Sequence, residues 1–158
     1  MINGLPAHPF LVHFVVVLAL LTAVLAVLCA IWPAARERLV WLVLALALVT
    51  TGTTPLTTES GEWLEHHIDK SSLVEEHAEL GDTMIFFSLG LLVAAVLLVV
   101  VHRKRLTGAL AAGVTVFVIA ASVVTVYQVY RIGDSGAKSA WHDALTTAPA
   151  GAADDDEK

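Results

Sequence analysis

Two histidines and two prolines stand where the first apolar segment begins, in the stretch GLPAHPFLVHF at residues 4–14. An imidazole can bind haem iron or a metal ion, or transfer a proton, so a histidine entering a membrane segment indicates a site or a polar packing contact. His8 and His13 lie about 140° apart around a helix axis, because each residue turns the helix by about 100°. We therefore expect only one of them to face a partner, with His8 at the lipid headgroups and His13 inside the bundle.

A second group of histidines lies in and after the stretch SGEWLEHHID, at residues 60–69. This stretch has the pattern of a short amphipathic helix on the membrane surface, with His67 on its apolar face and His66 turned towards water. Ser72 then begins a capping box, S-x-x-E, which opens the next helix and places His77 a turn or two inside it. We expect His77 to face His13 across the outer half of the bundle.

Three functions remain open for these side chains. The first is a redox accessory subunit, in which His13 and His77 are the axial ligands of one b-type haem and His67 is a possible substitute. The second is a metal site on the outer face, where His67 or His77 joins nearby carboxylates: Glu62, Glu65, Glu76 and Glu79. The third is an accessory or assembly subunit without a cofactor. The sequence contains no hydrolase triad, phosphate loop or CxxC motif, so it leaves open whether the protein is an enzyme.

Long apolar segments must position these residues. Apolar residues make up 57% of the chain and charged residues 15%, and the mean hydropathy is +0.77. Such a composition excludes an ordinary soluble domain. About 20 apolar residues in a helix span the roughly 30 Å hydrocarbon layer of a membrane. The apolar segments predict helices over about 9–32, 39–54, 73–102 and 107–131, and hence an all-α fold, an integral membrane four-helix bundle with a short amphipathic helix in its outer loop.

One domain accounts for nearly the whole chain. The four segments and their connections fill residues 1–146, which leaves no room for a separate soluble domain. Residues 147–158, TAPAGAADDDEK, combine small residues with like charges and are predicted to form a disordered acidic tail. No internal repeat is evident. The single cysteine, Cys29, excludes an intramolecular disulfide and an iron–sulfur cluster held by this chain alone.

The distribution of charge predicts the orientation in the membrane. Arg36, Arg38 and the basic run at 103–105 lie in two short connections, and basic residues favour the cytoplasmic side. Acidic residues gather at 59–82 and 154–157. We therefore predict that both the N-terminus and the C-terminus lie outside. The net charge of −6 then belongs mostly to the outer face, which disfavours nucleic acid as a partner and leaves the lipid bilayer as the expected environment.

Four stretches resemble the DUF2231 family of bacterial membrane proteins: GLPAHPFLVHF, TTGTTPLTTESGE, EHAELGD and YRIGDSGAKSAW. The resemblance covers nearly the whole chain. It implies a four-helix module in the bacterial plasma membrane with no established activity. Some relatives are joined to a Rieske iron–sulfur domain, which implies electron transfer and a membrane or iron–sulfur redox partner. With one cysteine, this chain would need that partner as a separate protein.

Overall fold

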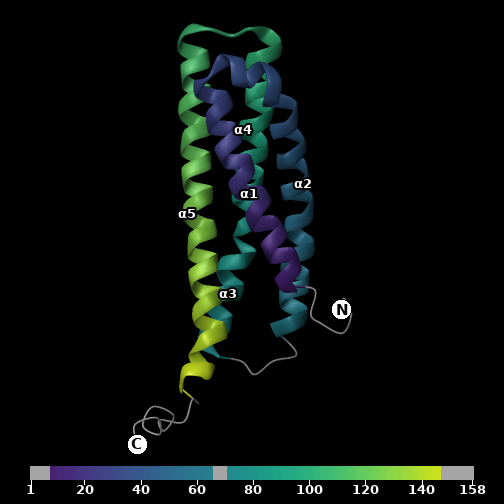
Figure 1. Cartoon of the computed structure of the whole chain (residues 1–158), viewed down its shortest axis with the longest axis vertical. Coiled ribbons are helices and arrows are strands. Elements are labelled where there is room, and N and C mark those ends of the chain that lie inside the picture. The colour runs from purple at the N-terminus through teal and green to yellow at the C-terminus, as the bar shows by residue number, and fades with distance from the viewer. Residues whose placement is uncertain (1–7, 66–70, 147–158) are drawn as a thin grey trace, which may run out of the picture.

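The computed structural model describes residues 8–65 and 71–146, and over 142–146 only the backbone. Five helices follow one another in these ranges: α1 (His8–Ile31), α2 (Pro33–Glu65), α3 (Ser72–Asp82), α4 (Met84–Lys104) and α5 (Gly108–Thr146). Only Thr83 separates α3 from α4, so the two form one long rod (Figure 1). The described residues thus contain four helical rods long and apolar enough to cross a membrane. The predicted all-α membrane bundle is confirmed.

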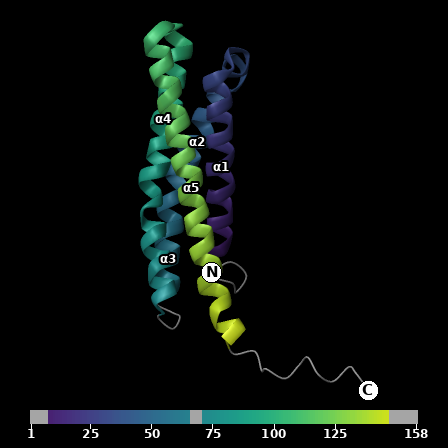
Figure 2. The same cartoon turned by 90° about the vertical axis from the view of Figure 1, so that its left-hand side faces the viewer.

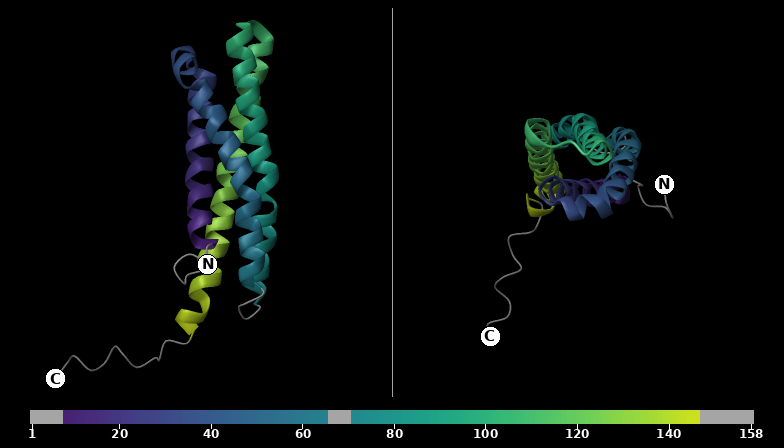
Figure 3. Two further views of the ribbon diagram at one scale, coloured as in Figure 1. Left: turned by 90° about the vertical axis from the view of Figure 1, so that its right-hand side faces the viewer. Right: turned by 90° about the horizontal axis from the view of Figure 1, so that it is seen from above.

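The four rods pack side by side as neighbours in a ring (Figures 2 and 3). α1 lies between α2 and α5, and α4 completes the ring between the same two helices. The α1–α2 and α4–α5 turns share one end of the bundle (Figure 1). The opposite end holds the start of α1, the end of α2, the start of α3 and the end of α5, and we call it the histidine end.

Small side chains allow the helices to approach closely. The buried stripe of α1 consists mostly of alanines, and it comprises Val15, Ala19, Thr22, Ala23, Ala26, Cys29 and Ala30. In a membrane, helix association depends on close packing and on interhelical hydrogen bonds, because lipid is as apolar as the side chains. Large apolar side chains such as Val24, Phe86 and Leu110 are accordingly exposed on the outside, where lipid would surround them. The bundle is therefore packed for a bilayer.

Hydrogen bonds between helices are concentrated on hydroxyl and amide side chains. The Thr51 hydroxyl on α2 donates to the Ser88 carbonyl on α4 at 3.1 Å. The Gln128 amide on α5 donates to the Thr83 hydroxyl at 2.7 Å and to the Leu80 carbonyl at 3.3 Å. These two contacts tie α5 to the junction between α3 and α4. The junction is therefore held in place from a neighbouring helix.

Two helices run beyond their predicted ends. The second was predicted over 39–54, yet α2 continues through Pro55 to Glu65, so residues 60–65 form its last turns and no separate surface helix. Pro55 has no N–H to offer the carbonyl four residues back, a loss that a membrane helix tolerates. The fourth was predicted to end at 131, yet α5 reaches Thr146.

Some predictions fall outside the described residues. The predicted surface helix over 60–69 includes residues 66–69, of which the structure describes nothing, and both His66 and His67 lie there. The predicted acidic tail over 147–158 lies outside as well. These expectations stay predictions.

Candidate functional site

Two imidazoles meet at the histidine end, and they belong to His8 on α1 and His77 on α3. Their ring centroids are 6.5 Å apart and their planes are 80° from parallel. The expected pairing of His13 with His77 is therefore wrong. His13 is exposed on the outside of α1, where its Nδ1 lies 2.6 Å from the Pro9 carbonyl oxygen in the same helix. His8 and His13 lie on different faces of α1, as predicted. However, His8 and not His13 is the one that faces the inside of the bundle.

The face of the helix decides which histidine points inwards. His8 precedes Val15 by seven residues and Ala19 by eleven, and both of these residues are buried. A helix returns to nearly the same face after seven or eleven residues, so His8 continues the buried stripe. His13 precedes Val15 by only two residues and lies about 160° away from it. The alanine-rich stripe was the signal in the sequence that identifies His8 as the inward residue.

His8 is anchored to α2 through its Nδ1 atom. That atom lies 3.1 Å from the Thr57 carbonyl oxygen and 3.3 Å from the Ser60 Oγ. A carbonyl oxygen can only accept, and the Ser60 hydroxyl donates its own proton to the same carbonyl at 2.7 Å. The Nδ1 of His8 therefore carries the ring proton and donates it. Its Nε2 is left with a free lone pair.

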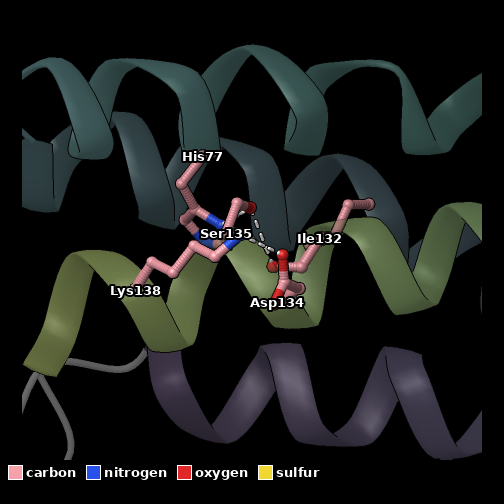
Figure 4. A network of polar contacts seen from close by, with 5 residues as sticks. All are labelled: His77, Ile132, Asp134, Ser135 and Lys138. Carbon is pink, nitrogen blue, oxygen red and sulfur yellow. Dashed lines mark hydrogen bonds and ion pairs between the residues drawn. The ribbon is translucent and has the colours of Figure 1, made fainter.

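His77 is anchored to α5 in the same way (Figure 4). Its Nδ1 lies 3.0 Å from the Ser135 Oγ. The Ser135 hydroxyl can donate to the Ile132 carbonyl at 3.0 Å and accept from the imidazole at the same time. In that arrangement Nδ1 of His77 carries the proton, and Nε2 has the lone pair. The Lys138–Asp134 ion pair drawn in the same view is a separate contact on the exposed side of α5, 2.6 Å long.

A glycine lies against each imidazole. A Cβ atom added at Gly61 on α2 would lie 2.8 Å from Cε1 of His8, and one added at Gly136 on α5 would lie 2.9 Å from Cε1 of His77. Real Cβ atoms essentially never come this close to another heavy atom. Any larger residue at either position would push the ring away. Both glycines are therefore part of the site.

The two anchors repeat one local pattern. Residues 59–61 read Glu-Ser-Gly and residues 134–136 read Asp-Ser-Gly. In each half of the chain the serine bonds the imidazole and the following glycine makes room for it. The likeness is confined to these triplets, and the expectation that the chain contains no internal repeat stays a prediction. The serines and glycines are site residues that the histidine positions alone do not show.

A cavity of about 60 Å³ lies beside the paired rings. It has room for about four water molecules, if each needs about 15 Å³. Its lining contains no carboxylate among the described residues. The lining residues are His8, Val12, Val15, Val16, Thr54, Thr57, Thr58, His77, Gly81, Met84, Val129 and Ile132. The site is thus an apolar chamber with two imidazoles, three hydroxyls and one thioether.

The carboxylate metal site predicted from the sequence does not form in the described part of the chain. No group of three or more His, Cys, Asp or Glu side chains in residues 8–65 and 71–146 is placed to hold a metal ion. The predicted ligand His67 lies outside these ranges. Cofactor binding by His13, His67 or His77 stays a prediction, and of the three only His77 lines the cavity.

Four apolar rods of membrane length define a multi-pass helical membrane protein, and the cavity with the two imidazoles lies between them. A family model described as "Predicted membrane protein (DUF2231)" matches residues 4–149, and the chain therefore belongs to this family. The resemblance seen in the four sequence stretches is confirmed. No curated protein and no solved structure matches the chain.

Proposed function

We propose that this membrane protein binds one transition-metal ion between His8 and His77. The observation that carries the proposal is the facing pair of imidazoles, each with Nδ1 committed as a donor. A histidine that binds a metal almost always donates its other ring N–H to a carbonyl, carboxylate or water, which fixes the ring and makes the ligand nitrogen more basic. Both rings are anchored in this manner, so both are prepared to bind through Nε2.

The distance between the rings suits a single bridging ion. A metal–imidazole bond is about 2.0–2.1 Å long, so an ion between two histidines separates the ligand nitrogens by about 4 Å and the ring centroids by about 6 Å. The observed centroid distance of 6.5 Å is close to this value. The proposal also requires each ring to present its Nε2 to the same ion, since the ring planes are 80° from parallel.

A b-type haem fits this arrangement poorly. Two axial imidazoles must lie on opposite faces of a porphyrin, so the porphyrin would have to lie between the rings of His8 and His77, where the structure has only a small cavity. The predicted haem pair also includes His13, whose ring lies on the outside of α1, and its possible substitute His67 lies outside the described residues. We therefore favour a metal ion over haem. The proposal keeps three expectations from the sequence. The protein lies in the bacterial plasma membrane, both termini lie outside, and its partner is a membrane protein or an iron–sulfur redox protein.

The metal content of the purified protein tests the proposal. We expect detergent-purified protein, offered copper, zinc, cobalt or nickel and then desalted, to carry one equivalent of metal per chain by elemental analysis. We also expect oxidised and dithionite-reduced absorption spectra without a haem Soret band. A stoichiometric haem spectrum would support the redox hypothesis instead. Protein that takes up none of these metals would contradict the proposal and favour a cofactor-free accessory subunit whose histidines serve packing.

The two site glycines give a second test. We expect Gly61→Ala and Gly136→Ala to weaken metal binding by about 10- to 100-fold, the usual range for residues that orient a ligand. The reason is that the new methyl group would displace the imidazole that lies 2.8 or 2.9 Å away. Competition titrations against a chelator measure the change.

Matched controls exist on the same two helices. A Cβ atom at Gly52 on α2 or at Gly133 on α5 would meet nothing within 4 Å. Gly52→Ala and Gly133→Ala should therefore leave metal affinity unchanged, and each should stabilise its helix by up to about 1 kcal/mol. Equal affinity losses in the site and control variants would mean that the glycines act through helix flexibility, and would contradict their role in positioning the rings.

A further inference from the structure

We propose that the ion is Cu(I) and that the thioether of Met84 is its third ligand. This inference rests on the metal site proposed above. It follows from three features of the described cavity: the position of Met84, the absence of charge in the lining, and the softness of the available donor atoms.

Met84 lies on the same face of the α3–α4 rod as His77, seven residues further along. It is buried, with 6% of its surface exposed, and it lines the same cavity as both imidazoles. Side chains on a helix tilt towards its N-terminus, so Met84 reaches back towards His77. Gly81 occupies the turn between them, and a Cβ atom there would meet nothing within 4 Å. Gly81 therefore leaves room on this face, beside Leu80, which packs against the cluster that contains Met84.

The junction between α3 and α4 holds Met84 in this position. Met84 is the first residue of α4, directly after the junction residue Thr83. The Thr83 hydroxyl donates to the Leu80 carbonyl at 2.7 Å and accepts from the Gln128 amide at 2.7 Å. The direction in which α4 starts, and with it Met84, is thus fixed from α5.

The cavity offers no negative charge to balance a metal ion. Its described lining contains neutral imidazoles, hydroxyls, one thioether and aliphatic groups, and no carboxylate. Moving an ion from water into such a medium costs free energy that rises with the square of its charge, so a divalent ion costs about four times as much as a monovalent one. A chamber of neutral donors therefore favours a monovalent ion.

The donor atoms point to the same ion. Soft sulfur donors suit Cu(I), zinc and iron–sulfur clusters, and imidazole nitrogen suits copper as well as zinc. Zn²⁺ in structural sites almost always takes four ligands, and Ca²⁺ and Mg²⁺ take six or more oxygens. Cu(I) is stably coordinated by two or three ligands. Two imidazoles and one thioether thus form a complete set for Cu(I) and an incomplete set for the other ions.

Anaerobic competition with bicinchoninate, a chelator of Cu(I), tests the inference on the full chain in detergent. We expect one Cu(I) per chain, bound at least about 100-fold more tightly than Zn²⁺ measured in parallel. X-ray absorption should show nitrogen scatterers together with one sulfur at about 2.3 Å, the length of a metal–sulfur bond. Because this spectrum is recorded on the unaltered protein, it does not depend on any variant folding correctly.

Met84→Leu is the matched variant, since it keeps the volume of the side chain and removes the sulfur. It should lower Cu(I) affinity about 10-fold, remove the sulfur scatterer and leave Zn²⁺ affinity within about twofold. A wild-type protein that prefers Zn²⁺, or that binds copper without sulfur scattering, would overturn the copper assignment and leave the two-histidine metal site standing. A protein that binds no metal at all would overturn both proposals.

Discussion

Alanine at either His8 or His77 is expected to reduce bound metal from one equivalent per chain to none. Each imidazole supplies one of the two nitrogen ligands, and the described lining of the cavity offers no carboxylate or thiolate to replace it. The loss should appear both in elemental analysis and in a chelator competition, where the affinity should fall by at least about 1,000-fold. This is the largest change expected of any single substitution in the chain.

Two further variants separate metal binding from packing. His13→Ala removes an imidazole from the same helix, but its ring is exposed and bonds only to its own helix among the described residues, so metal content should not change. His77→Gln keeps a donor for Ser135 and should retain thermal stability while losing the metal. If the pair serves packing alone, alanine would instead cost about 1 kcal/mol or less, as interhelical hydrogen bonds in membranes do. If His13→Ala lost the metal and His8→Ala kept it, the result would favour the pair predicted from the sequence, His13 with His77.

The fold was predictable because composition and length decide it. Four apolar segments separated by short polar connections allow almost no other arrangement in a bilayer, since every backbone group must be bonded within a helix. Ends of helices were harder to place. Pro55, Ser60 and Gly61 look like loop residues, yet α2 passes through all three. The serine hydroxyl is used for a bond to the Thr57 carbonyl, and the glycine is needed for contact with an imidazole.

The candidate site was predictable in part. The inward position of His77 can be derived from the start of its helix. The cap of α3 is Ser71, whose hydroxyl accepts from the Val74 backbone N–H at 3.3 Å, one residue before the predicted Ser72. Depth in the membrane favours His13 as the partner of His77, whereas the helix face selects His8. A histidine two residues from a buried valine lies on the wrong side, however deep it is. The anchoring serines could not be assigned from local pattern alone, because each lies more than fifty positions from its histidine.

The polar cavity residues and the apolar core lie at different ends of the bundle, and this arrangement bears on whether an ion could cross the membrane through it. The paired histidines, the buried Thr54 and the half-buried Thr57 lie towards the histidine end. Towards the opposite end the described core is apolar, built around Cys29, Val43 and Leu98. Apart from the Cys29 thiol, the described residues of this core cluster offer an ion no polar side chain. The site is therefore better suited to holding a metal at one face of the membrane than to passing it across.

The orientation of the chain in the membrane decides which compartment would supply the proposed metal ion. We expect a cysteine introduced at the histidine end to react with a reagent added outside the cell, and one at the opposite end not to react. The start of α1 and the end of α5 share the histidine end, whereas the basic run at 103–105 lies at the opposite end (Figure 1). Because basic residues favour the cytoplasm, the histidine end should face outwards. A cysteine introduced at Lys138, whose side chain is 64% exposed, should react with a membrane-impermeant maleimide in intact cells. Thr107→Cys, in the exposed turn after α4, should react only after the cells are opened.

The native cysteine does not interfere with this experiment, because Cys29 is completely buried and should remain unlabelled in both preparations. The two introduced cysteines are controls for each other, since they are exposed and lie at opposite ends of α5. The reverse pattern, with Thr107→Cys labelled in intact cells and Lys138→Cys protected, would contradict the predicted orientation. It would place His8 and His77 on the cytoplasmic side, so that the proposed ion would have to be drawn from the cytoplasm and exchanged with partners there.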